Sequence, residues 1–225
     1  MEKKIQIVKN GPYKVTGGVP LVRATMEIDE EGISQSWGRG KQYEDRDTYF
    51  LCRCGGSDSK PYCDGMHVKI GFRGEEVATH GAGPTKKYSG EKIDLIDEEG
   101  LCASMRFCDG APRAWNAAVN SGIGGNREIA IREACDCAAG RLTAVDKDGK
   151  VHEPKFGQEI SPIYDTAAGQ RGPLWVKGGI PIEGADGQEY RIRNRVTLCR
   201  CGHSRNMPFC DISHFGVPSM KGKDV

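Results

Sequence analysis

Ten cysteines supply most of the residues whose types and spacing could do chemistry in this chain. Two sets share one spacing: a cysteine, one residue, a cysteine, eight residues, a cysteine, three residues and a histidine. The sets are Cys52, Cys54, Cys63 and His67, then Cys199, Cys201, Cys210 and His214. Three thiolates and an imidazole can hold a tetrahedral zinc ion or a 2Fe-2S cluster, which needs four protein ligands and accepts histidine on one iron. The spacing leaves both open.

Disulfide bonding is the alternative use of these cysteines. The opening residues MEKKIQIVKNGPY have no apolar signal-peptide core, and no apolar run approaches the ~18 residues of a membrane span. We therefore expect a cytoplasmic protein without a membrane span, in a reducing compartment where metal or cofactor ligation is favoured over disulfides. Neighbouring CxC thiols also bridge poorly.

The composition excludes some functions. Glycine, at 31 of 225 residues, is about twice as frequent as the usual ~7%, and only 7% of residues are aromatic. A turn-rich chain with a weak core is expected to need bound groups for stability. The 32 basic and 31 acidic residues balance, which argues against a nucleic-acid partner.

Two pairs of similar segments show that the chain contains a duplication. GPYKVTGGVPL (11–21) returns as GPLWVKGGIPI (172–182), and LCRCGGSDSKPYCDGMH (51–67) returns as LCRCGHSRNMPFCDISH (198–214). The offset is 161 residues for the first pair and 147 for the second, so the first copy holds 14 additional residues. We place them in the polar stretch 29–46 and expect a loop there.

The pattern of elements predicts an α+β protein of three modules. Both outer modules are expected to be β-rich, with strands in KIQIV, LVRATMEI and YRIRNRV, the last presenting one face made of Tyr190, Ile192, Asn194 and Val196. The middle module is predicted to contain a strand (92–95), a cysteine loop, two helices (111–119 and 127–134) and a hairpin (141–151). Gly- and Pro-containing stretches separate the modules, giving boundaries at 1–78, 86–160 and 166–225.

The two ligand sets resemble the CDGSH iron-sulfur domain, or NEET family, whose pattern is CxC, two residues, Ser or Thr, three residues, PxCDG, a small residue and His. The matching positions are Ser57, Pro61, Asp64 and Gly65 in the first copy and Ser204, Pro208 and Asp211 in the second. Met66 replaces the small residue, and Ile212 stands where the family has Gly. If that position needs a positive φ, Ile212 strains the turn before His214.

The resemblance implies one 2Fe-2S cluster per motif, with the two CxC cysteines on one iron and the third cysteine and the histidine on the other. NEET domains with one motif are generally intertwined homodimers. Two motifs in one chain are therefore expected to form an intrachain pseudo-dimer, and the protein to be a monomer with an internal pseudo-twofold axis.

Charge near the clusters affects how easily they are reduced. Replacing one thiolate by a neutral imidazole makes a 2Fe-2S site less negative, so its reduction potential rises. Arg53 and Arg200 stand between the paired cysteines. They either offset the remaining charge of the clusters or are solvated surface residues.

The middle module has four cysteines of its own, Cys102, Cys108, Cys135 and Cys137. Cys102 and Cys108 have the separation of the outer cysteines in the ferredoxin loop CxxCxxC, with Met105 at the central position. The module thus looks like a divergent single-cluster ferredoxin-like domain, with a 3Fe-4S centre on Cys102, Cys108 and Cys137, or a 4Fe-4S centre if Cys135 is a fourth ligand. The alternative is a domain that has lost its cluster and keeps small buried cysteines.

These observations predict an iron-sulfur protein for electron transfer, redox sensing or cluster transfer, with a redox partner or cluster-acceptor protein. No catalytic signature such as Ser-His-Asp is visible, and we expect a carrier rather than an enzyme. The competing hypothesis is a zinc-stabilised interaction protein without redox activity. Visible absorption separates the two, because 2Fe-2S clusters are coloured and zinc sites are not.

Overall fold

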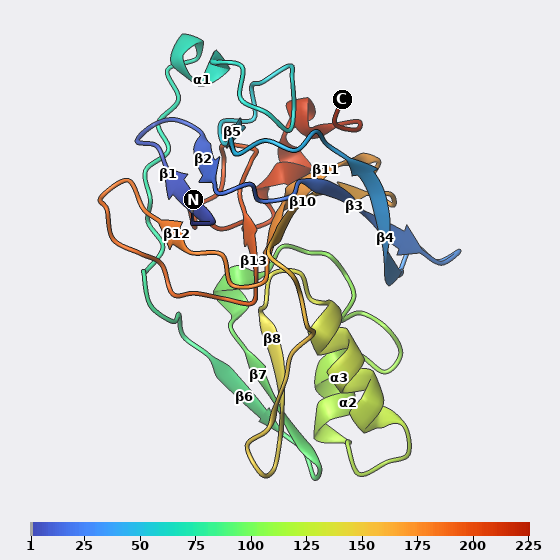
Figure 1. Cartoon of the computed structure of the whole chain (residues 1–225). Helices are drawn as coiled ribbons and strands as arrows, with labels where there is room; N and C mark the ends of the chain where they lie inside the picture. The colour runs from blue at the N-terminus through green and yellow to red at the C-terminus, as the bar shows by residue number, and fades with distance from the viewer. Residues whose placement is uncertain (1) are drawn as a thin grey trace.

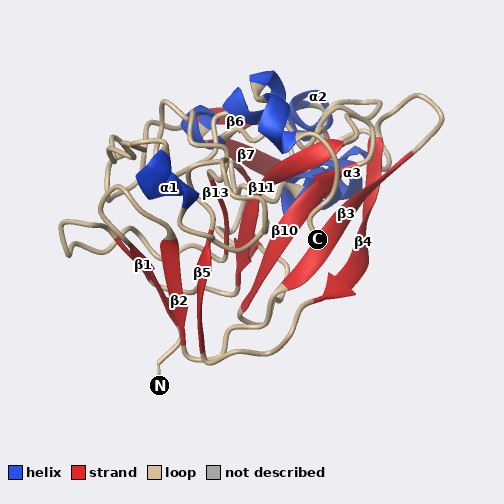
Figure 2. Cartoon of the chain, turned by 90° about the horizontal axis from the view of Figure 1, so that it is seen from above, coloured by secondary structure: helices blue, strands red, loops and turns tan. Residues whose placement is uncertain are grey.

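The computed structural model describes residues 2–225, which form three β-sheets. Two sheets lie side by side in one half of the molecule, and the third projects from them together with two helices (Figures 1 and 2). The first sheet has the order β12-β1-β2-β5. Its strands are β1 (Lys4–Ile7), β2 (Tyr13–Thr16), β5 (Thr48–Leu51) and β12 (Ile182–Glu183). Buried residues alternate with partly exposed ones along β1 and β2, as expected of strands with one face in the core.

The second sheet has the order β13-β11-β10-β3-β4. Its strands are β3 (Val22–Ile28), β4 (Ser34–Gln42), β10 (Glu159–Asp165), β11 (Gln170–Lys177) and β13 (Arg195–Leu198). The antiparallel set β10-β11-β13 of the second copy corresponds to β1-β2-β5 of the first. The duplication seen in the sequence is therefore also a duplication of strand order.

The two copies exchange a strand. After its GGVP segment the first copy crosses to the second sheet, where β3 pairs in parallel with β10 and Ala24 lies opposite Ile163. After its GGIP segment the second copy crosses to the first sheet, where β12 pairs in parallel with β1 and Ile182 lies opposite Ile5. Each sheet thus contains strands from both copies, which is the arrangement expected of an intrachain pseudo-dimer.

The prediction of a loop over the polar stretch 29–46 is wrong in its central part, because β4 occupies residues 34–42. β4 is an edge strand that pairs only with β3 among the described strands. Most of its side chains are partly or fully exposed. A strand exposed in this way does not need alternating apolar residues, and its sequence SQSWGRGKQ has none. Its side chains contact the middle module instead. Ser34 Oγ donates to Met105 O at 2.7 Å, and Trp37 stacks on Phe107 with ring centroids 4.6 Å apart.

The prediction of a strand over residues 190–196 is also wrong in its first part, because β13 begins at Arg195. Polar side chains of residues 190–194 pair with distant acids. The Tyr190 hydroxyl donates to Glu76 at 2.8 Å, and the Arg193 guanidinium makes two hydrogen bonds with Glu98. These contacts link the second copy to the segment that enters the middle module, and they replace a strand ladder.

The middle module is an antiparallel sheet covered by two helices (Figure 1). Its order is β6-β7-β8-β9, and the elements are β6 (Lys86–Ser89), β7 (Ile93–Asp97), β8 (Leu142–Asp146), β9 (Val151–His152), α2 (Ala114–Val119) and α3 (Asn126–Asp136). The core between them uses alanines of both helices against Ile93, Leu95 and Leu142. The strand, the two helices and the hairpin predicted from the sequence are confirmed.

The remaining elements are short helices near the cysteine motifs: α1 (Met66–Lys69) and the 3-10 turns η1 (Glu99–Leu101), η2 (Ser213–Gly216) and η3 (Pro218–Met220). The principal core spans both copies and includes Met105 and Phe107 of the middle module. Within residues 2–225 no helix has both the length and the apolar character to cross a membrane.

Glu133 of α3 is a buried carboxyl that should make stability depend on pH. It is 2% exposed, its Oε2 has no hydrogen-bond partner, and burial raises its pKa to about 7. Because the folded-state pKa is above the unfolded value, the protonated carboxyl is tolerated at low pH and its ionisation destabilises the fold as pH rises through about 7. We expect Glu133→Gln to raise the free energy of unfolding by up to about 3 kcal/mol at pH 8 and by little at pH 5.

Urea unfolding of the whole chain at both pH values, followed by circular dichroism, measures this difference. Glu128→Gln on the exposed side of α3 is the matched control and should change neither midpoint. An equal gain from Glu133→Gln at pH 5 and pH 8 would mean that burial does not raise the pKa of this carboxyl in the folded state.

Candidate metal centres

Each CxC segment lies at the end of a strand, where the backbone turns its sulfur atoms toward one point. Cys52 and Cys54 follow β5, and their Sγ atoms lie 3.9 Å apart. Cys63 Sγ lies 3.3 Å from His67 Nδ1. The four side chains predicted from the first motif, called site 1 from here on, are thus arranged as two close pairs.

The second motif repeats this arrangement after β13. Cys199 and Cys201 have Sγ atoms 3.5 Å apart, and Cys210 Sγ lies 3.5 Å from His214 Nδ1. These four residues are called site 2. In both sites the imidazole presents Nδ1 to the neighbouring sulfur, so the same ring nitrogen faces the third cysteine of each motif.

The proton state of the paired thiols suits a metal ligand. The hydrogen bond from Cys54 holds the pKa of Cys52 below its ordinary value, and Cys201 has the same effect on Cys199. A thiolate is the form that binds metal, so one thiol of each pair loses its proton readily, while the same hydrogen bond raises the pKa of its partner, Cys54 or Cys201.

Ser and Asp side chains build the loops that present the third cysteine and the histidine. Ser57 Oγ donates to Tyr62 O at 2.7 Å, and Asp64 accepts the backbone N–H groups of Asp58 and Met66 at 2.8 and 3.0 Å. These backbone donors, the one of Asp58 first, hold the pKa of Asp64 below its ordinary value. The corresponding bonds of the second loop are made by Ser204 and Asp211. The residues Ser, Pro and Asp of the motif therefore shape the loop.

The residue before each histidine turn has a positive φ. Gly65 has φ 87° and Ile212 has φ 79°, so the strain expected from the isoleucine is present. A β-branched residue in the left-handed region is costly, by about 1–2 kcal/mol. Ile212 is 37% exposed, so its removal sacrifices little burial.

We expect Ile212→Gly to raise the free energy of unfolding by about 1 kcal/mol, because the relief of strain exceeds the added entropy of the unfolded chain. The reverse change Gly65→Ile should destabilise the protein by a similar or larger amount. Urea midpoints of the two variants measure the effect. A loss of stability in Ile212→Gly would show that the isoleucine side chain contributes more by its contacts than it costs in strain.

Arg53 and Arg200 are both buried at 1% exposure, so neither is a solvated surface residue. The Arg53 guanidinium donates to three backbone carbonyls, those of Gly11, Gly74 and Val8. The Arg200 guanidinium donates to the carbonyls of Gly172 and Ile163 and, through one nitrogen, to both oxygens of Asp224 at 2.8 Å. The equivalent arginines thus differ in one respect: only Arg200 has a carboxylate partner.

The two sites also differ in burial. Cys63 and His67 are partly exposed, whereas Cys210 is 3% and His214 2% exposed. The His214 ring packs on Phe215 with ring centroids 4.6 Å apart. Burial, and next the positive charge of Arg200, lower the pKa of His214 to about 4.

The backbones of the two sites are in direct contact. Cys54 and Cys201 form an isolated antiparallel bridge, and the residue after each, Gly55 and Gly202, lies against the opposite strand. A Cβ at Gly55 would stand 2.3 Å from Cys201 O, and a Cβ at Gly202 would stand 2.5 Å from Cys54 O. Neither glycine can carry a side chain without separating the sites.

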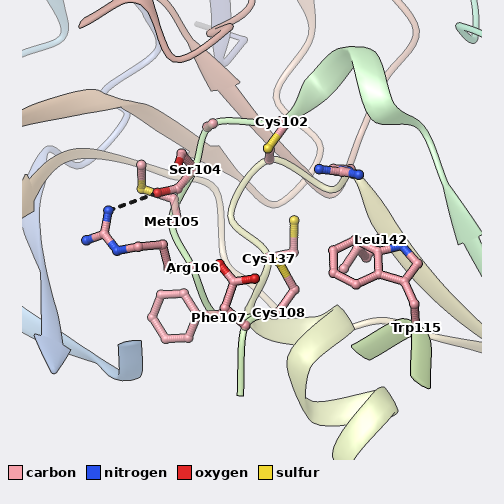
Figure 3. Close-up of a pocket in the computed structure, with 13 residues that line it drawn as sticks. Cys102, Ser104, Met105, Arg106, Phe107, Cys108, Trp115, Cys137 and Leu142 are labelled. Atoms are coloured by element: carbon pink, nitrogen blue, oxygen red, sulfur yellow. Dashed lines mark hydrogen bonds between the residues drawn. The ribbon is translucent and has the colours of Figure 1, made fainter. Parts of the chain in front are cut away.

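Three cysteines of the middle module line one cavity, called the middle cavity, with a volume of about 130 Å³. Cys102 and Cys108 come from the loop between η1 and α2, and Cys137 comes from the end of α3; Figure 3 shows their side chains directed into the same space. Burial, then the neighbouring Cys137, raise the pKa of Cys108 to about 12.

Cys135 lies elsewhere. It is not among the residues that line the middle cavity, and its Sγ donates to His152 O at 3.7 Å. The middle cavity is instead completed by Trp115 and by Arg141, whose guanidinium is held by Asp97 at 2.6 and 2.8 Å. Sequence reasoning missed Arg141, because nothing in the local sequence distinguishes it from a surface arginine.

Throughout residues 2–225, no group of three or more His, Cys, Asp or Glu side chains is arranged to hold a single metal ion. All ten cysteines are free thiols, so no disulfide uses any of the predicted ligands.

A duplicated β-rich scaffold with two matching sets of three cysteines and a histidine is typical of a metal-binding protein. Comparison with protein-family models then gives the family: the model described as iron-binding zinc finger CDGSH type matches residues 10–68 and 171–215. The chain therefore contains two regions in tandem that match the CDGSH iron-binding family. Comparisons with curated proteins and with solved structures gave no match.

Proposed function

We propose that site 1 and site 2 each hold one 2Fe-2S cluster. Cys52 and Cys54 would bind one iron of the first cluster, and Cys63 and His67 the other; Cys199 with Cys201, and Cys210 with His214, would do the same for the second. The observation that carries this proposal is the arrangement of each site as two pairs of donors, 3.3 to 3.9 Å apart. Tetrahedral ligands at about 2.0 to 2.3 Å from a metal are about 3.5 to 3.8 Å apart, so each pair suits one metal ion.

The role we propose is that of an electron-transfer or cluster-carrier protein. A bound 2Fe-2S cluster would supply reversible one-electron chemistry. The protein residues fix the pairs of donors, exclude water from site 2 and leave the Cys63–His67 edge of site 1 accessible. Another protein, either a redox partner or a cluster acceptor, would therefore approach site 1.

The assembly and compartment follow the same reasoning. Because the two CDGSH domains already exchange strands within one chain, we propose a monomer with an internal pseudo-twofold axis. Ten free thiols suit a reducing compartment, and we propose the cytoplasm. The three modules proposed are residues 1–78, 86–160 and 166–225.

We further propose that the middle module is a divergent ferredoxin-like domain with a 3Fe-4S cluster on Cys102, Cys108 and Cys137. The supporting observation is that three sulfur atoms line one cavity, because a 3Fe-4S cluster needs three thiolate ligands close together. Cys135 is left out of this ligand set, since its thiol is bonded to His152 on another side.

Iron and acid-labile sulfide measured on anaerobically purified protein test the two CDGSH clusters. We expect at least four irons per chain, falling by two in Cys63→Ala and by two in Cys210→Ala, with visible absorption that decreases in step. Zinc without sulfide, and a colourless protein, would replace this proposal by the zinc-stabilised interaction protein.

The third cluster is tested by electron spin resonance of the oxidised protein. A 3Fe-4S centre should give a signal that disappears in Cys108→Ala and persists in the control Cys135→Ala, while the 2Fe-2S bands remain in both. If fully loaded protein has no such signal, the middle module keeps its cysteines only as buried apolar residues.

A further inference from the structure

The two CDGSH domains differ in buried charge at one matched position. Lys60 in the first loop corresponds to Met207 in the second, and both side chains are buried, at 5% and 3% exposure. The Lys60 ammonium donates to Ser57 O within the loop of site 1. None of the ion pairs in the described part of the chain involves Lys60.

The arginines within the CxC segments add a second difference. Arg53 is held only by neutral carbonyls, so its charge is uncompensated. Arg200 is neutralised by Asp224, which is 8% exposed and also accepts a hydrogen bond from Arg171 at 3.2 Å. The C-terminal segment that carries Asp224 has no counterpart in the first domain at Arg53, where the carbonyl of Gly74 takes that place.

The other charged groups near the sites do not cancel this difference. Asp64 and Asp211 occupy equivalent positions in the two loops. Arg106 and Asp165, which face His214 from the middle module and from β10, form an ion pair at 2.7 Å and compensate each other. Site 1 therefore has two buried cations without a carboxylate partner, whereas the buried Arg200 of site 2 has a carboxylate partner, which it shares with the partly exposed Arg171.

We propose that the clusters of the two sites, although they have identical ligands, have unequal reduction potentials, with site 1 the higher. This inference rests on the proposed function. Reduction adds one negative charge to a site, so nearby cations that are poorly screened stabilise the reduced state and raise the potential. Burial without compensating charge disfavours the added negative charge, and site 2 is the more buried. Both effects place the first added electron at site 1, beside the accessible Cys63–His67 edge.

Lys60 and Asp224 are then residues that adjust the reduction potentials of the two clusters. Each can be tested by a substitution that either introduces the residue of the other domain or removes one charge. In Lys60→Met, site 1 receives the residue of site 2, and its potential should fall toward that of site 2. In Asp224→Asn, Arg200 loses its carboxylate, and the potential of site 2 should rise. The two variants together should narrow or reverse the gap.

The measurement is an anaerobic titration of loaded whole protein with dithionite, followed by visible absorption and electron spin resonance. His67→Cys and His214→Cys identify which signal belongs to which site, because a fourth thiolate shifts only the substituted site downward. Lys155→Met, which removes an exposed lysine of the middle module, is the matched control and should leave both potentials in place. Lys60→Arg retains the charge and should keep the potential of site 1 high, which separates charge from loop structure.

Two separated reduction steps in the native protein, with the shifts above, support the inference. Equal potentials of the two 2Fe-2S clusters, in protein with at least four irons and four sulfides, overturn it while leaving the proposed function intact. The same holds if Lys60→Met and Lys60→Arg shift site 1 equally. A lack of iron and sulfide in the native protein would instead be a failure of the proposed function.

Discussion

Site 1 is expected to lose its cluster about tenfold faster than site 2 when loaded protein is moved from pH 8 to pH 5. A ligating imidazole must be unprotonated at the nitrogen that faces the metal, so protons compete with iron as pH falls. The pKa of His214 is lowered to about 4 by burial and by Arg200. At pH 5 only about one tenth of such a group is protonated, so most His214 rings keep the neutral form that binds metal. His67 is partly exposed, and solvent protons reach its ring directly.

The sign of the effect follows from the direction of the shift. A histidine whose folded-state pKa is depressed resists protonation until the pH falls below that pKa. The neutral ligand form of His214 therefore persists through the window between about pH 6.5 and pH 4. Visible absorbance followed over time at acidic pH values should decrease in two phases, one for each cluster. At pH 8 both clusters should be retained and neither phase should be seen.

Substitutions assign the two phases. His67→Cys should slow the fast phase, and His214→Cys should leave it unchanged. Phe215→Ala, which uncovers the His214 ring, should accelerate the slow phase only. A single phase in the native protein, or a fast phase that responds to His214→Cys, would show that burial does not protect site 2. Equal decay rates across the pH series would show that these histidines are not ligands.

The second large effect is expected at the contact between the two domains. Gly55→Ala should destabilise the protein by more than about 3 kcal/mol and reduce cluster loading at both sites, although the substitution lies in the loop of site 1. A Cβ at this position meets Cys201 O at 2.3 Å, and the residue has φ 76°. The added methyl group must break the bridge between Cys54 and Cys201, and the left-handed backbone alone costs about 1–2 kcal/mol.

Gly149→Ala is the matched control. Gly149 has φ 90° in the turn of the middle hairpin, and nothing lies within 4 Å of the position of its Cβ. Gly149→Ala should therefore lower the free energy of unfolding only by the cost of an alanine in the left-handed conformation, without a steric clash. Both CDGSH clusters should be loaded normally. Urea midpoints together with iron content of the three proteins measure the effect. Equal destabilisation by the two substitutions, or loss of iron from site 1 alone in Gly55→Ala, would contradict the coupling of the sites through this bridge.

The middle module illustrates what can and cannot be predicted from local sequence. Its strand, two helices and hairpin follow from patterns within short windows, and the structure contains them at nearly the predicted residues. The separation of Cys102 and Cys108 indicated a shared site, and both line the middle cavity with Cys137. The direction of the Cys135 thiol could not be predicted, because it depends on the distant carbonyl of His152.

The sequence by itself determined the two candidate ligand sets, the duplication, and the main strands and helices of the middle module. The loop of 16 residues from the first cysteine to the histidine is shaped by its own Ser, Pro and Asp residues. Its conformation therefore depends on hydrogen bonds between residues that are close in the sequence. The tertiary structure decided the features that make the two sets unequal. β4 exists because a polar segment meets the edge of β3, Arg200 is neutralised because the C-terminal segment returns Asp224 to it, and His214 is buried by surroundings that His67 lacks. These features depend on contacts between residues far apart in the chain, where burial and charge are set by packing rather than by spacing.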